Sequence, residues 1–121
     1  MAYFSPAQNY TEKRLNIGDL VRLSPLSSYL MRSENDYPSI GILKGAILVI
    51  ERALDPVHLS LVVAEIDNEL VIRRFLTTPL LAFQNLDECE EIQRLPVDSN
   101  PPIWGVIAYV LNDIAGKGFN F

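Results

Sequence analysis

Side chains that could carry out chemistry gather in a polar loop over residues 32–39 and just after it. Ser33 and Ser39 supply hydroxyl groups, and Lys44 supplies an amine that could act as a base. A serine-lysine dyad works only if the hydroxyl and a neutral amine lie within hydrogen-bond distance. Ser39 and Lys44 would need a different backbone path to meet, and loop serines usually hydrogen-bond to the backbone. We therefore expect both serines to be structural.

Two carboxylates and one histidine are the other candidates for chemistry. Glu34 and Asp36 would share a face if the loop were extended, but a hydrolase with paired carboxylates needs both to converge on one water. Two acids in a polar loop are more often simply solvated. His58 is the only histidine, and no second histidine or cysteine stands at metal-ligand spacing from it. The residues therefore indicate neither a metal nor a cofactor.

The elements that position this loop are expected to be short strands. Asp67 and Asn68 form a two-residue hairpin turn between apolar runs, since both tolerate a positive φ angle. Short β-branched runs separated by turn signals indicate a mainly β fold. The segment 86–94 is open to three interpretations: a loop, a short helix or an edge strand. We expect strands over residues 46–52, 59–66, 69–76, 80–84 and 103–111, a short apolar run at 29–31, a helical turn at 10–15, and a short strand or helical turn at 19–23.

Length and composition indicate one globular domain over residues 1–121, with 49% hydrophobic residues. We expect the ends, residues 1–9 and 115–121, to be flexible. Cys89 has no partner for an internal disulfide, and the chain begins with no secretory leader, which indicates the reducing cytoplasm. No apolar run approaches the roughly 20 residues that cross a membrane. The net charge of -5 argues against direct binding to nucleic acid, which needs a basic face.

The loop reads Glu-Asn-Asp-Tyr over residues 34–37, and the second hairpin strand reads Val-Ile-Arg-Arg over residues 71–74. With the runs around them, these segments resemble the UmuD and LexA family, the self-cleaving serine-lysine (S24) peptidases of the bacterial SOS response. In that family a Gly-Asp-Ser-Met loop carries the nucleophilic serine, and the second hairpin strand carries the lysine that deprotonates it. Asp36 therefore stands at the serine position and Arg73 at the lysine position. The resemblance covers residues 4–114 and implies a compact, coiled β-sheet of the LexA, UmuD and signal-peptidase type.

The resemblance implies a domain without peptidase activity. The guanidinium of Arg73 stays protonated at any working pH, so it cannot act as a base, and the neighbouring Arg74 fails for the same reason. Asp36 has no hydroxyl, and an ionised carboxylate is a poor nucleophile toward an amide. Because the two replacements carry opposite charges at positions that would face each other, we predict a salt bridge between them. The alternative is two unrelated surface charges.

The resemblance also bears on partners and function. Residues 5–30 align without gaps with the segment that follows the self-cleavage site of UmuD, so the chain begins near the start of the processed, active form. That form dimerises and joins UmuC to make an error-prone translesion DNA polymerase. We expect a cytoplasmic homodimer, or a mixed dimer with UmuD, that acts as an always-on accessory subunit or as a competitor. The alternatives are a stress regulator that pairs with a LexA-type repressor and, last, an active self-cleaving peptidase.

Dimerisation is expected to involve the apolar run at residues 103–111. Trp104 and Tyr109 stand five residues apart, so on a strand they face opposite sides. One of them is then free for an interface, as aromatic residues often are. The alternative is that the whole run is internal core. The candidate interface residues are Ile103, Trp104, Val106, Ile107 and Tyr109.

Overall fold

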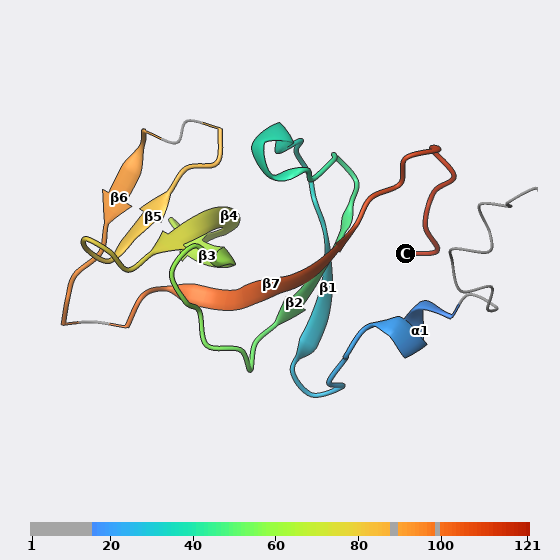
Figure 1. Cartoon of the computed structure of the whole chain (residues 1–121), viewed down its shortest axis with the longest axis horizontal. Helices are drawn as coiled ribbons and strands as arrows, with labels where there is room; N and C mark the ends of the chain where they lie inside the picture. The colour runs from blue at the N-terminus through green and yellow to red at the C-terminus, as the bar shows by residue number, and fades with distance from the viewer. Residues whose placement is uncertain (1–15, 88–89, 99) are drawn as a thin grey trace, which may run out of the picture.

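The computed structural model describes residues 16–87, 90–98 and 100–121. The expected helical turn at 10–15, the expected flexible end at 1–9 and Cys89 lie outside these residues. The described chain folds into a seven-stranded antiparallel sheet in the order β1-β2-β7-β3-β4-β5-β6, which confirms the mainly β fold (Figure 1). Its elements are α1 (Ile17–Leu20), β1 (Ser28–Arg32), the 3-10 helix η2 (Pro38–Ile40), β2 (Ile47–Glu51), β3 (Leu61–Ile66), β4 (Glu69–Leu76), β5 (Ala82–Gln84), β6 (Ile92–Arg94) and β7 (Ile103–Leu111).

The expected strands form within a few residues of their predicted bounds. The hairpin turn is confirmed, with φ angles of 52° at Asp67 and 63° at Asn68. The described part of segment 86–94 contains β6, so the edge-strand interpretation is correct. The helical alternative is correct near residue 19, where Asn16 caps α1 by accepting a hydrogen bond from Gly18 N. Among the described residues, no helix is long and apolar enough to cross a membrane.

Buried side chains form two clusters on opposite sides of the sheet. Antiparallel partners share a face, and faces alternate along a strand, so the pairs Val63–Ile72 and Val62–Arg73 point to opposite sides. Val63 and Ile72 belong to one cluster, and Val62 to the other. The first core comprises Ile42, Ala46, Leu48, Ile50, Val63, Ile72 and Leu86. The second core comprises Val62, Ala64, Phe75, Phe83, Leu95 and Val106.

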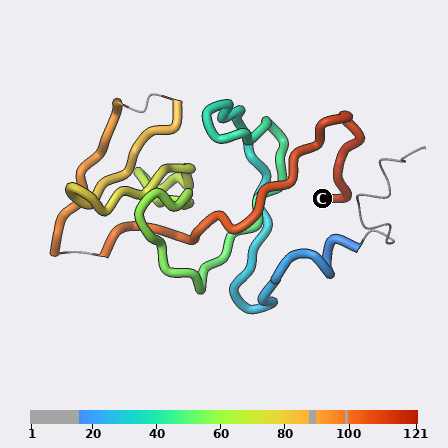
Figure 2. The backbone as a smooth tube through the Cα atoms, in the orientation of Figure 1, coloured from blue at the N-terminus to red at the C-terminus, as the bar shows by residue number. Residues whose placement is uncertain are grey.

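The long strand β7 runs through the middle of the molecule and joins its two halves (Figures 1 and 2). It pairs with β3 through its N-terminal half and with β2 mainly through its C-terminal half. Against β2 the register slips by one residue at Ala108, a β-bulge. Ile107 therefore pairs with Ile50 on the side of the first core, whereas Tyr109 pairs with Val49 on the opposite side.

After β7 the chain folds back in a tight turn toward the same end of the sheet (Figure 2). The carboxylate of Asp113 accepts hydrogen bonds from Gly118 N at 2.6 Å and from Lys117 N at 2.9 Å. Gly116 and Gly118 have φ angles of 72° and 85°, in the left-handed region that favours glycine. The segment that we expected to be flexible, residues 115–121, thus makes defined contacts, and its mobility stays a prediction.

Replacing Gly105 by alanine should destabilise the sheet. A Cβ atom at Gly105 would lie 2.5 Å from Cγ2 of Ile50, a fully buried β-branched side chain in the first core. We expect Gly105→Ala to lower the free energy of unfolding by about 1–3 kcal/mol, as overpacking of a core does. Urea denaturation measures this change, with Gly18→Ala on the exposed turn of α1 as the control. Equal stability of the two variants would contradict the close approach of β7 to Ile50.

The turn after β7 should loosen in acid. Its two backbone amides, first Gly118 and then Lys117, hold the pKa of Asp113 below the ordinary value of 3.8. A lowered folded-state pKa means that the stabilisation is present above pH 3.8 and is lost as the pH falls through the lower value. Amide hydrogen exchange at Lys117 and Gly118 should therefore lose protection in acid. Asp113→Asn should have little protection at any pH, and a wild-type acid response in that variant would contradict the assignment.

Candidate functional site

The loop between β1 and β2 is closed at its tip and pinned to the sheet. Tyr37 N donates to Ile42 O at 2.7 Å and Ile42 N donates to Tyr37 O at 3.2 Å, with η2 between them. Ser39 Oγ donates to Leu86 O at 3.0 Å, and Ser33 Oγ donates at 2.8 Å to the carbonyl two residues further on. Both serine hydroxyls thus hydrogen-bond to backbone carbonyls, as we expected of structural serines.

Asp36 acts as a clip across the base of this loop. Its Oδ1 accepts a hydrogen bond from Lys44 N at 2.6 Å, while the side chain remains exposed to solvent. A carboxylate that accepts a backbone N–H makes a stronger bond than a neutral acceptor does. Asp36 therefore has a structural role within its own loop.

Arg73 points away from the loop. It pairs with Val62 of the second core, whereas Ile72 packs with Ile42 of the loop in the first core. The guanidinium of Arg73 donates to Ile72 O at 2.9 Å and forms no ion pair with Asp36 within the described chain. The predicted salt bridge is therefore wrong. The alternation of side chains along β4 sends Arg73 to the side of the sheet opposite the loop.

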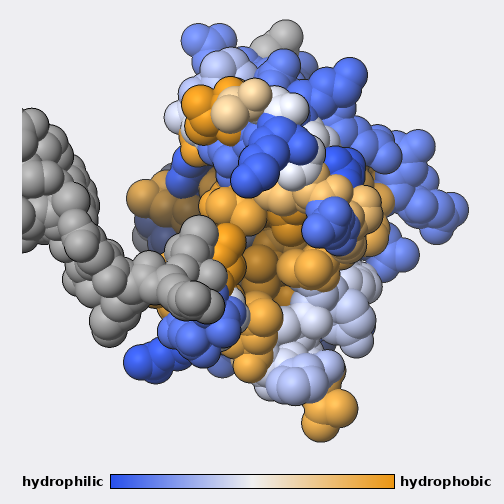
Figure 3. Space-filling view, turned by 90° about the vertical axis from the view of Figure 1, so that its right-hand side faces the viewer, coloured by the Kyte–Doolittle hydropathy of each residue, from blue (hydrophilic) through white to orange (hydrophobic). Residues whose placement is uncertain are grey.

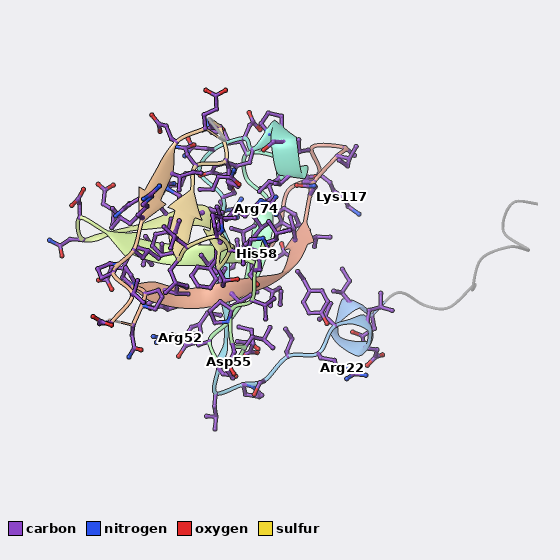
Figure 4. All side chains as sticks on the ribbon, turned by 60° about the vertical axis from the view of Figure 1, so that its left-hand side comes forward. Arg22, Arg52, Asp55, His58, Arg74 and Lys117 are labelled. Atoms are coloured by element: carbon purple, nitrogen blue, oxygen red, sulfur yellow. The ribbon has the colours of Figure 1, made fainter. Side chains whose placement is uncertain are left out.

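Arg74 and His58 hold the other end of the hairpin, where Figure 4 shows them close together. Arg74 Nη1 donates to Leu59 O at 3.0 Å, and His58 Nδ1 accepts a hydrogen bond from Thr77 N at 3.0 Å. His58 is thus used as a backbone anchor. Across the ranges that the structure describes, no three His, Cys, Asp or Glu residues gather closely enough to hold a metal ion.

A polar groove of about 380 Å³ lies between the loop and the first half of β4. β5 pairs with β4 only at residues 74–76, so the edge of β4 before residue 74 has no strand partner in the described chain. Neither Asp36 nor Arg73 lines the groove, and its walls contain no lysine or histidine. Its charged lining residues are Arg32, Glu34 and Glu69, so the groove offers carboxylates but no lysine amine of the kind that a serine-lysine dyad needs. The lining residues are Met31, Arg32, Ser33, Glu34, Asn35, Tyr37, Leu48, Glu69, Leu70, Val71 and Ile72.

The five predicted interface residues do not share one surface. Ile103 and Val106 pack on the second core, and Trp104 and Ile107 pack on the first. Tyr109 is the most exposed of the five, at 37%, and it faces the side opposite Trp104, as predicted. A dimer through β7 therefore has only the C-terminal half of the strand to offer, and the dimer itself stays a prediction.

Sequence relatives cover most of the chain, although no protein-family model matches it. The chain is 30% identical to Protein ImpA of Salmonella typhimurium over 109 residues, which are 89% of this chain and 74% of ImpA. It is 31% identical to Protein MucA of Escherichia coli over 109 residues, 88% of this chain and 75% of MucA. Protein SamA of Salmonella typhimurium is 29% identical over 79 residues, 64% of this chain and 56% of SamA.

Asp36 and Arg73 should contribute to stability independently. Asp36→Ala removes an exposed hydrogen bond, and we expect it to lower the free energy of unfolding by about 1 kcal/mol. A double-mutant cycle with Arg73→Ala, measured by urea denaturation, should give a coupling energy below about 0.5 kcal/mol, because the two side chains share no contact. The same cycle between Asp36 and Ser39 gives the background for two positions in one loop. A coupling energy between Asp36 and Arg73 well above that background would contradict this and support a salt bridge between them.

Proposed function

The chain belongs to the UmuD-like family of SOS mutagenesis proteins, and we propose that it is a member without peptidase activity. In this proposal it acts as a dimeric accessory subunit of an error-prone translesion DNA polymerase of the UmuC type. The observation that carries the proposal is the pair of residues at the positions where the family resemblance expects serine and lysine. Asp36 offers a carboxylate where a hydroxyl is needed, and Arg73 has no neutral form that could accept a proton.

The geometry around these two positions supports the loss of activity. The carboxylate of Asp36 is engaged by Lys44 N, and Arg73 lies on the face of the second core. A nucleophile and its base must lie within hydrogen-bond reach of each other, or tighten to it when a substrate binds. Residues on opposite faces of one sheet do not meet this condition by small movements.

A family member without peptidase chemistry acts through its surfaces. The net charge of -5 opposes direct attraction to DNA phosphates, so in this proposal the polymerase partner makes the contact with DNA. Exposed apolar residues at the end of β7, which include Val110 and Leu111, suit a contact with a second copy or with a UmuD chain. The cytoplasm, where the polymerase works, is the proposed location.

The purified chain should not cleave itself. At about pH 10, a lysine base would be partly neutral and self-cleavage would be fast, whereas arginine stays protonated. We expect intact mass spectrometry to find no fragment after prolonged incubation, with a UmuD-type protein that retains both catalytic residues as the positive control. A defined cut in the unmodified chain would overturn the inactive assignment.

Restoring the residue types alone should not restore activity. In the double variant Asp36→Ser, Arg73→Lys the new amine starts from a position on the opposite face from the loop. We therefore expect this variant to remain intact under the same alkaline conditions. Cleavage in the double variant only would mean that residue 73 reaches the loop and that our account of the site geometry is wrong.

Identification of the proteins that bind the chain in cells tests the accessory-subunit function. A tagged full chain purified from bacterial cells after DNA damage should recover a UmuC-type polymerase, identified by mass spectrometry. The matched control is the charge reversal Arg94→Glu on the exposed edge strand β6, which should recover the same partner if that edge is not involved. Recovery of a LexA-type repressor without any polymerase would contradict the proposal and favour a regulator. Recovery of neither would contradict both.

A further inference from the structure

One face of β1, β2 and β7 is apolar and belongs to neither core. On these strands, every second side chain points away from the first core. These side chains form two rows that run across the strands, one through Val49 and one through Ile47. Leu30 and Leu111, one in each row, are 52% and 41% exposed. Figure 3 shows apolar atoms gathered in the middle of this side of the molecule, with polar atoms around them. We name this surface the outer face, and it comprises Leu30, Ile47, Val49, Tyr109 and Leu111.

A groove of about 370 Å³ crosses the outer face, and nearly all of its lining is apolar. Segment 16–27 runs along it and contributes Ile17, Val21 and Leu23. This cover is weakly attached, because α1 buries none of its residues and Arg22 N reaches Tyr109 Oη only at 3.3 Å. Contiguous apolar surface of this kind is typical of a protein interaction site.

Opposite charges stand at the two ends of the outer face. Arg32 pairs with Ile47, in the row at one end of the face. Glu51 lies at the other end, two residues along β2 from Val49. The row through Val49 lies between these two ends. The hydroxyls of Ser27 and Ser28 hold the pKa of Glu51 below its ordinary value of 4.5, so this side chain is ionised at neutral pH. A two-fold axis through the middle row exchanges the two ends. Arg32 of one copy then meets Glu51 of the other, so the face is complementary to itself in charge.

The C-terminal tail already occupies part of this surface. Phe119 and Phe121 line the groove. Arg32 Nη2 donates to Phe121 O at 3.0 Å, and its guanidinium carbon lies 5.5 Å from the centre of the Phe121 ring. An arginine that holds the tail in this way is not free for a bidentate pair with a carboxylate of a second copy. The tail and a second copy therefore compete for Arg32.

We infer that the outer face is the contact between two copies of this chain, in which Arg32 of each copy meets Glu51 of the other. The tail, residues 115–121, is a strap that must leave the groove before the two copies join. This inference rests on the dimer of the proposed function and adds its surface, its orientation and its regulation. The strap sets the concentration at which the dimer forms, because its release precedes every association.

Charge reversal tests the pairing. Arg32→Glu alone and Glu51→Arg alone place like charges opposite each other twice in a symmetric dimer, and we expect sedimentation velocity to show at least a tenfold weaker self-association. A mixture of the two variants should form a mixed dimer close to wild-type strength, because each carboxylate then meets an arginine. This rescue requires both variants to be folded. Arg94→Glu and Glu65→Arg, charge reversals on β6 and β3, are the matched controls and should leave association unchanged.

Removal of the strap tests the competition. A chain that ends at Ile114 should associate more tightly than the full chain, by about tenfold or more, because the groove and Arg32 are then free. If the truncated chain associates as tightly as the full chain or more weakly, the inference that the tail acts as a strap is wrong.

The outcomes separate this inference from the proposed function. A full chain that dimerises, but without rescue in the mixture of charge variants, overturns the outer face while the proposed dimer stands. A full chain and a truncated chain that both remain monomeric at high micromolar concentration overturn the inference and the proposed dimer together. Rescue in the mixture, with tighter association of the truncated chain, supports the whole inference.

Discussion

The two-residue turn at Asp67 and Asn68 fixes the register of β4 against β3, and the architecture of the candidate site follows from that register. In a sheet, a shift by one residue turns every side chain of a strand to the other face. The observed register places Ile72 in the first core with Ile42, so the loop is held on the sheet by apolar packing. The same register sends Arg73 to the second core. The site is thus built on packing and backbone hydrogen bonds, without a charge pair between the loop and β4.

The unequal covering of the two halves of the sheet explains why only one of them leaves an apolar surface. On β3, β4 and β5, both sides carry buried side chains, because the second core is completed by Leu95 after β6. On β1 and β2, the first core fills one side only. The opposite side has α1, a single turn, and the tail for cover. Burial of apolar area drives both folding and association, so a half-covered sheet face favours further contact.

The sequence allowed the strands to be predicted because their signals are local. The β-branched run at residues 46–52 and the Asp67-Asn68 turn each specify one element and need no knowledge of the rest of the chain. The family resemblance supplied the positions of Asp36 and Arg73, and their residue types led to the proposal that the base and the nucleophile are missing. The residue types do not show on which side of the sheet the side chain of Arg73 lies, because that depends on the pairing of β4 with β3.

The outer face escaped prediction for a related reason. Residues 47–51 are apolar on both faces apart from Glu51, so their pattern gives no contrast between a buried and an exposed side. The charge complementarity of Arg32 and Glu51 needs the pairing of β1 with β2 before it becomes visible. Among the predicted interface residues, the buried position of Val106 likewise follows from the pairing of β7 with β3.

The β-bulge at Ala108 divides β7 into two segments whose side chains have different surroundings. Before it, side chains such as Val106 and Ile107 serve the interior, and after it Tyr109 and Leu111 serve the surface. The two segments are therefore open to separate sequence change. Folding limits change in the first segment, whereas in the proposed dimer the identity of the partner limits change in the second. A lineage could in this way exchange one binding partner for another through a few residues at the end of a single strand, while the domain beneath keeps its fold.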